Sequence, residues 1–129
     1  MELGNALNWF EIPVDDFSRA KKFYETIFNY QMPESMMGNS RMGFFLYDMP
    51  GGKVGGAIVH SPDFYSPAAN GTLVYLNAQP DLQIILARVE EAGGSILTPK
   101  TIISEEQNLG YWAVIKDTEG NRVALHSMR

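Results

Sequence analysis

The chain has 129 residues, of which 45% are hydrophobic and 19% are charged, as is typical of a folded globular domain. Its formal net charge of -5 argues against nucleic acid as a partner, because binding to nucleic acid normally requires a basic surface. The lack of cysteine excludes disulfides, thiolate metal sites and a cysteine nucleophile, and no apolar run is long enough to span a membrane. With no signal-peptide pattern at the N-terminus, we expect one compact domain, residues 1–129, in the cytoplasm.

The N-terminal part of the chain combines a short strand, an acidic cap and an amphipathic helix. Phe10, Ile12 and Val14 form an apolar row with the two-residue period of a strand. Asp15 and Asp16 follow, and a carboxylate at this point is expected to cap the next helix near its positive end. The helix carries apolar side chains at helical spacing: Phe17, Ala20, Tyr24, Ile27 and Phe28. We expect them to pack on the apolar row, which leaves the opposite face of the strand free to bind a ligand.

The rest of the first half is predicted to form three more strands, at residues 30–32, 41–47 and 53–60. Residues 61–70 contain two prolines and end at Asn70, the first residue of an Asn-Gly pair, so they are predicted to be a linker.

The second half repeats this order. It is predicted to form a strand at 72–78, a helix from Pro80 that stops at Gly93, and strands at 95–98, 111–116 and 122–126. We therefore predict an α+β fold of two βαβββ modules, one over about residues 5–60 and one over about residues 71–128. Their cupped mixed sheets are expected to enclose a cleft with the faces that carry no helix.

Four segments carry a more specific pattern, at residues 9–24, 55–58, 89–94 and 117–123. The first joins an aromatic strand, an Asp-Asp pair and a helical Phe-Tyr, and the last is an Asp-Thr-Glu-Gly-Asn turn. Together they resemble the vicinal oxygen chelate superfamily, which includes glyoxalase I, bleomycin-resistance proteins and extradiol dioxygenases. The resemblance implies paired βαβββ modules, a small-molecule ligand and assembly as a homodimer.

In the metal-dependent members of that superfamily, His, Gln and Glu side chains on four strands hold a divalent cation on the face away from the helices. Carried over by position, these ligands fall on or near Trp9, Ala57, Leu73 and Ala124. None of these side chains ligates a metal. The resemblance therefore implies family membership without the usual metal site, and glyoxalase activity does not transfer.

Three polar residues each lie two positions beyond one of these vacated positions: Glu11, Tyr75 and His126. They are predicted to converge on the cleft, where Glu11 or His126 would transfer a proton. The alternative for Glu11 is a salt bridge or an interface hydrogen bond, and for His126 a structural or exposed role. A displaced metal site of Glu11, His60 and His126 is a less favoured alternative, because two histidines and a carboxylate form a recognised metal set.

The predicted ligand-binding residues are Trp9, Tyr75, Asn77 and Trp112, since aromatic surfaces stack on flat ligands. The alternative is that the aromatic residues belong to the core or to a dimer interface. Two functions remain open: an isomerase-like or lyase-like enzyme acting on a small oxygenated metabolite, and a non-catalytic protein that sequesters an aromatic or cationic compound. A third possibility retains the fold only as a dimerising module.

Overall fold

The computed structural model describes residues 1–129 and contains two four-stranded sheets and two helices. Sheet A has the strand order β1-β4-β3-β2 and sheet B the order β5-β8-β7-β6. The first half contains β1 (Trp9–Pro13), α1 (Phe17–Phe28), β2 (Glu34–Met37), β3 (Ser40–Phe44) and β4 (Gly55–His60). The second half contains β5 (Tyr75–Asn77), α2 (Leu82–Leu86), β6 (Ser95–Ile102), β7 (Tyr111–Lys116) and β8 (Arg122–Ser127).

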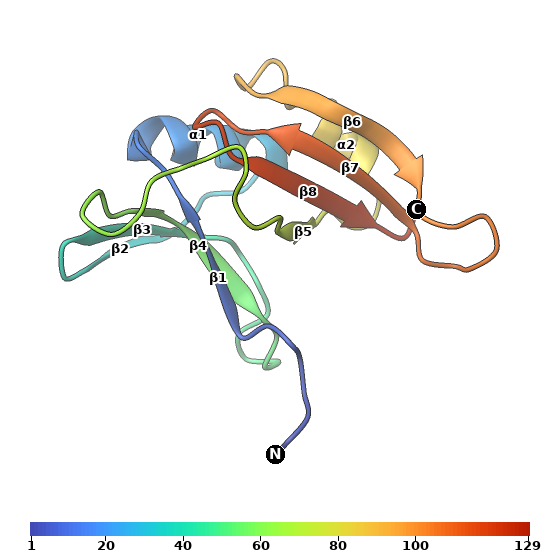
Figure 1. Cartoon of the computed structure of the whole chain (residues 1–129), viewed down its shortest axis with the longest axis horizontal. Coiled ribbons are helices and arrows are strands. Elements are labelled where there is room, and N and C mark those ends of the chain that lie inside the picture. The colour runs from blue at the N-terminus through green and yellow to red at the C-terminus, as the bar shows by residue number, and fades with distance from the viewer.

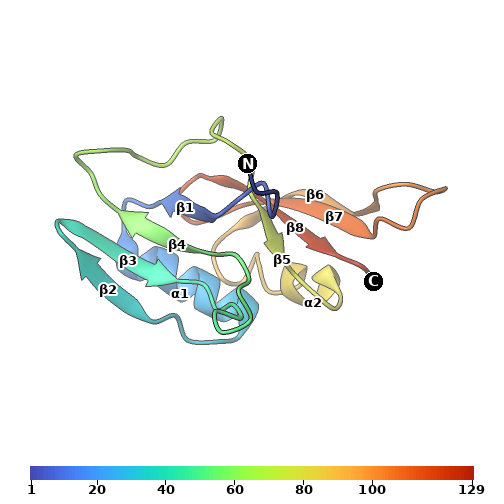
Figure 2. The same ribbon diagram turned by 90° about the horizontal axis from the view of Figure 1, so that it is seen from below.

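Both sheets are mixed, because β1 runs parallel to β4 and β5 parallel to β8, whereas all other neighbouring strands are antiparallel. Figures 1 and 2 show sheet A and sheet B as two separate sheets, with α1 beside sheet A and α2 beside sheet B. This arrangement confirms the predicted α+β fold built from two βαβββ units. Neither helix has the length and apolar character needed to cross a membrane.

The first helix begins and ends where its sequence signals indicate. Asp16 is the N-cap, and its carboxylate accepts a hydrogen bond from the backbone amide of Arg19 at 3.1 Å. Asn29 ends the helix in the left-handed conformation, with φ 57°. The period-2 pattern of β1 places Phe10 and Ile12 on the helix side of sheet A, where they join the main core.

One hydrophobic core joins the two halves. It contains buried residues of the first half, such as Phe23 and Tyr24, together with Leu82 and Leu125 of the second half. The helices also contact each other. The helix sides of both sheets therefore face a common core, and the faces without helices point away from it.

A polar contact reinforces this packing at the turn between β7 and β8. The side chain of Glu119 has no exposed surface and accepts a hydrogen bond from the amide of Asp16 at 2.7 Å and another from Arg19 at 2.8 Å. In the same turn, Asp117 accepts a hydrogen bond from the buried hydroxyl of Tyr24 at 2.7 Å. The turn is thereby fixed to the start and middle of α1.

The sequence-based prediction of secondary structure was wrong at several points. Residues 30–32 form no strand, because Tyr30 stacks on Phe28 at 5.6 Å between ring centroids and Met32 is buried in the core. The second helix is shorter than predicted, since its N-cap is Asp81 and it ends at Leu86. The residues that follow form turns, although Val89 remains fully buried as its apolar spacing predicted.

The strand predicted to stop before Pro99 instead continues to Ile102. Its pairing with β7 shifts register between Ile96 and Thr98 and again between Thr98 and Thr101. β6 is an edge strand of sheet B and pairs only with β7. A proline and two irregularities in β6 therefore disturb this one pairing and no other.

Candidate functional site

Trp9 and Glu11 lie on the outer face of sheet A, the face that points away from α1. Glu11 is opposite Ala57 in the parallel pairing of β1 with β4, and Trp9 packs on a small cluster that includes Met42 and Val59. A hollow of about 550 Å³ opens on this face. Its lining includes Trp9, Glu11, Met42, Phe44, Val59 and Tyr65. The alternation of β1 thus places a carboxylate beside an apolar, largely aromatic surface.

Tyr65 links the connection between the sheets to this hollow. Its hydroxyl donates a hydrogen bond to Oε1 of Glu11 at 2.5 Å. Burial raises the pKa of the Tyr65 phenol, and the hydrogen bond and charge of Glu11 raise it further. The phenol therefore stays protonated at neutral pH and remains a donor. Sequence reasoning missed this residue because it lies in the predicted linker, where only its aromatic character distinguishes it.

A second hollow of about 550 Å³ lies where β1 approaches the second half of the chain. Trp9 and Glu11 line it together with Val74, Asn121 and Arg122. Asn121 supports its wall, because its Nδ2 donates to the carbonyl of Pro13 at 2.7 Å. Glu11 borders both hollows and forms no ion pair with Arg122 or any other cation.

The other four predicted site residues share the outer face of sheet B. His126 is opposite Asn77 in β5 and opposite Trp112 in β7. Tyr75 lies two residues before Asn77 in β5 and therefore on the same face of the sheet. The carbonyl of Leu109 accepts a hydrogen bond from Nε2 of His126 at 2.8 Å. A shallow hollow of about 410 Å³ is lined by Tyr75, Asn77 and His126, while Trp112 is half-buried beside it.

The two groups of predicted site residues do not come together within one chain. None of the five main hollows is lined by both Glu11 and His126, the two proposed proton carriers. His60 is turned elsewhere, since its Nδ1 donates to the carbonyl of Val14 at 3.0 Å. The chain brings no three His, Asp or Glu side chains close enough to hold a metal ion, so Glu11, His60 and His126 do not form the displaced site.

The positions on which the family resemblance places the cation ligands do not fit a metal here. Trp9 and Ala57 pack in the same small apolar cluster, and Ala124 is completely buried beside Tyr75 in the β5–β8 pairing. Indole and methyl groups offer no lone pair suited to a divalent cation.

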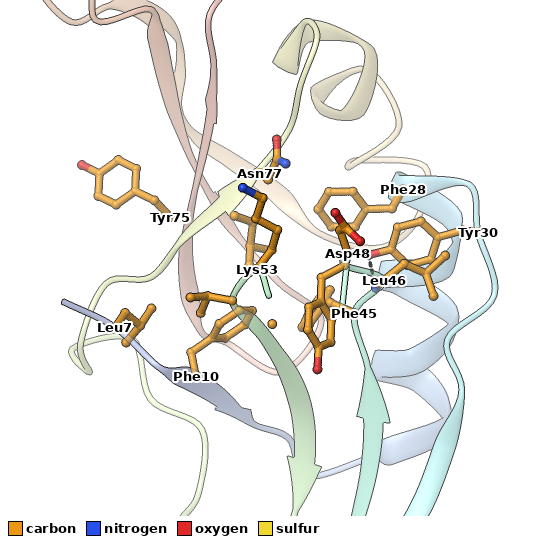
Figure 3. A pocket seen from close by; sticks show the side chains of 14 residues that line it. Leu7, Phe10, Phe28, Tyr30, Phe45, Leu46, Asp48, Lys53, Tyr75 and Asn77 are labelled. Atoms are coloured by element: carbon orange, nitrogen blue, oxygen red, sulfur yellow. Dashed lines mark hydrogen bonds between the residues drawn. The ribbon is translucent and has the colours of Figure 1, made fainter. Parts of the chain in front are cut away.

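A third hollow of about 370 Å³ lies between the halves, and two of the predicted ligand-binding residues, Tyr75 and Asn77, also line it. Figure 3 shows the aromatic rings of Phe10, Phe28 and Phe45 within it, and the charged side chains of Asp48 and Lys53 beside them. These aromatic residues belong to the helix side of sheet A and its neighbouring segments, and sequence periodicity assigned Phe10 and Phe28 to the packing of the first strand and helix. Only the packing of the second half against the first leaves a space beside them.

The comparisons with known proteins agree with this fold. The model of the Glyoxalase/Bleomycin resistance protein/Dioxygenase superfamily matches residues 6–125. No curated protein matches the sequence. A glyoxalase/bleomycin resistance protein from Albidiferax ferrireducens is 18% identical, with a TM-score of 0.66 over 94% of this chain and 97% of the other.

Two further solved structures show the range of proteins that share the fold. TnmS3, an antibiotic binding protein from a Streptomyces species, is 20% identical, with a TM-score of 0.62 over 98% of both chains. A mutant of glyoxalase I from Zea mays is 16% identical, with a TM-score of 0.70 over 95% of this chain but only 46% of the other. Because the family model covers nearly the whole sequence, this chain belongs to the Glyoxalase/Bleomycin resistance protein/Dioxygenase superfamily.

Proposed function

We propose that this protein binds a planar apolar molecule with a cationic group in the hollow on the outer face of sheet A. The observation that carries the proposal is the position of the Glu11 carboxylate among Trp9, Phe44 and Tyr65. The fold also serves antibiotic binding in the protein from Streptomyces, which supports a binding role. The protein would act without a metal, since the family's ligand positions carry apolar side chains.

The aromatic side chains suit a flat ligand. Trp9 lies in a tilted arrangement with Phe44, with 6.1 Å between ring centroids, and both rings line the hollow. Such a wall stacks on a flat molecule and attracts a cation through the faces of its rings. The hollow of about 550 Å³ falls within the range of small-molecule sites.

Glu11 supplies the charge selectivity. It is exposed and forms no ion pair, so its carboxylate can meet a ligand cation without first breaking a salt bridge. Its oxygen Oε1 accepts from Tyr65, which fixes the direction of the carboxylate. The net charge of -5 favours the approach of cations over anions.

Binding is favoured over proton-transfer catalysis for the same reasons. Glu11 has one titratable hydrogen-bond partner, Tyr65, and the raised pKa of that phenol makes it a weak acid. His126, the second proposed proton carrier, lines a different hollow on sheet B. One chain therefore offers no acid and base pair poised on the same ligand.

The homodimer expected from the resemblance is part of the proposal. About half of Tyr75 is exposed on β5 and about half of Leu97 is exposed on β6, at the two opposite edges of sheet B. Covering this sheet with a second copy would remove apolar surface from water. Size-exclusion chromatography with light scattering tests this: a mass of one chain across the working concentration range would contradict it.

The binding proposal is tested by isothermal titration calorimetry with two planar probes of opposite charge, proflavine and 9-anthracenecarboxylate. Proflavine is expected to bind and the anion is not. Glu11→Gln should weaken proflavine about tenfold, because a charge-assisted contact is lost while the shape of the side chain is kept. Glu106→Gln, an exposed change that lines none of these hollows, is the matched control and should leave the affinity unchanged.

Two outcomes would contradict the proposal. Equal binding of the anion and the cation would show that Glu11 sets no selectivity. Unchanged proflavine affinity in Glu11→Gln would place the ligand elsewhere. Loss of tryptophan fluorescence on binding offers a second readout, because Trp9 lies in the wall of the hollow.

A further inference from the structure

We propose that the hollow between the two halves is a second, separate binding site for an α-amino acid with an apolar side chain, held as a zwitterion. This hollow of about 370 Å³ combines an aromatic floor with one free cation and one free carboxylate oxygen at its mouth. It uses neither Glu11 nor Trp9, so it is distinct from the site proposed above.

The floor is built from rings that hold one another in place. Phe10 and Phe45 lie 5.5 Å apart between centroids, and Phe28 meets Phe45 edge-on at 6.1 Å. Phe28 is in turn stacked on Tyr30. These contacts keep the floor formed before any ligand enters, so an apolar side chain placed there would leave water at little cost of reorganisation.

The Tyr30 hydroxyl also holds one wall. Its oxygen accepts a hydrogen bond from the amide of Leu46 at 3.3 Å, and Leu46 begins the segment that leads to the charged residues at the mouth. A further bond, from the amide of Lys53 to the carbonyl of Asp48 at 3.0 Å, closes this segment into a loop. The loop therefore presents both charged residues from a supported backbone.

The two charges at the mouth do not neutralise each other. Asp48 and Lys53 line the same hollow, yet they form no ion pair, and the ammonium of Lys53 has no hydrogen-bond partner. One oxygen of Asp48 accepts from the amide of Gly51 at 2.9 Å, which leaves the other free. Figure 3 shows Asp48 and Lys53 at separate positions around the space.

A zwitterion satisfies both groups at once. Its carboxylate pairs with Lys53 and its ammonium with the free oxygen of Asp48, while its side chain lies on the aromatic floor. Asn77 adds a donor, because its Oδ1 already accepts from the amide of Gln79 at 2.9 Å and its Nδ2 remains available for a carboxylate. A simple carboxylate or a simple amine would leave one of the two charged groups without a partner.

Isothermal titration calorimetry with three probes tests the proposal: L-phenylalanine, 3-phenylpropanoate, which lacks the ammonium, and phenethylamine, which lacks the carboxylate. L-Phenylalanine is expected to bind, and each analogue about tenfold more weakly, because one charge-assisted contact is missing. Equal affinity for all three, or no binding of L-phenylalanine, would overturn the proposal.

Variants locate the two contacts. Lys53→Met should weaken L-phenylalanine about tenfold but leave phenethylamine unchanged, since phenethylamine has no carboxylate to lose. Asp48→Asn, which keeps the acceptor for Gly51, should weaken L-phenylalanine about tenfold and leave 3-phenylpropanoate unchanged. Lys22→Met, on the exposed side of α1, is the matched control. If the loop variants weakened every probe equally, or none, the assignment of the two charges would be wrong.

The same assay separates this site from the first. Glu11→Gln should not change L-phenylalanine affinity, because Glu11 does not line this hollow. If Glu11→Gln weakened L-phenylalanine as strongly as Lys53→Met does, the amino acid would bind on sheet A and the second site would be refuted.

Discussion

Replacing Glu119 with glutamine is expected to weaken the contact between the two halves of the chain. Both carboxylate oxygens of Glu119 are used: Oε1 accepts from the amides of Asp15 and Asp16 and from Arg19, and Oε2 accepts from Arg19 and from Thr118. Glutamine keeps one acceptor and puts an amide donor in place of the other. At least one of these donors then loses its acceptor and meets another donor.

The pKa of Glu119 sets the size of the effect. Burial alone would raise this pKa, but the hydrogen bonds from Arg19, Asp16 and Thr118 and the charge of Arg19 outweigh burial and lower it from 4.5 to about 2. Because a change of one unit in a pKa is worth about 1.4 kcal/mol, this lowering of the pKa corresponds to roughly 3 kcal/mol of stability at neutral pH. Because Arg19 is about half exposed and screened by water, we expect Glu119→Gln to cost about 2 kcal/mol.

Urea unfolding across pH measures this loss. A carboxylate with a lowered pKa stabilises the fold above its unfolded pKa of about 4.5, and this stabilisation disappears as the pH falls towards about 2. The difference between the original protein and Glu119→Gln should therefore be full at pH 7 and shrink below about pH 4.5. Glu106→Gln is the control for a carboxylate that is exposed. Equal stability at pH 7, or a difference that persists unchanged in acid, would refute the reasoning.

Two further stability measurements test the packing between the halves. Gly94→Ala should cost about 2 kcal/mol in urea unfolding, because its Cβ would lie 2.7 Å from the buried ring of Phe23. Gly71→Ala should be nearly neutral, because its Cβ would meet only the carbonyl oxygen of Ala68, at an ordinary contact distance of 4.0 Å. A neutral Gly94→Ala would show that the packing yields easily. Tyr24→Phe should cost about 1–2 kcal/mol, because Asp117 loses a buried donor at 2.7 Å, and a change below about 0.5 kcal/mol would contradict this.

Sequence periodicity predicted much of the fold because it reports which side of an element is buried. The alternation in β1 placed Phe10 and Ile12 on the helix side and Trp9 and Glu11 on the outer face, and the structure confirms both. The capping residue Asp16 likewise predicted where α1 begins. These features depend on residues that are close together in the chain, so they can be predicted from the local sequence.

The same reasoning failed where long-range contacts decide local structure. Residues 30–32 have the composition of a strand, but Tyr30 stacks on Phe28 and Met32 enters the common core. The second helix ends at Leu86, although the apolar spacing that predicted a longer helix continues to Val89. Turns can bury apolar side chains at the same spacing as a helix, so the spacing alone did not show where the helix ends.

By itself, the sequence determined the α+β class, the repeat of its two halves and the sheet face that each candidate side chain occupies, because backbone geometry makes these properties local and periodic. Tertiary structure alone decided which side chains meet. It placed Glu11 beside Tyr65, kept His126 in another hollow and left a space beside Phe45 between the halves. The reason is physical: the two halves are oriented by a shared core of residues far apart in the chain, and periodicity along one strand does not encode that orientation.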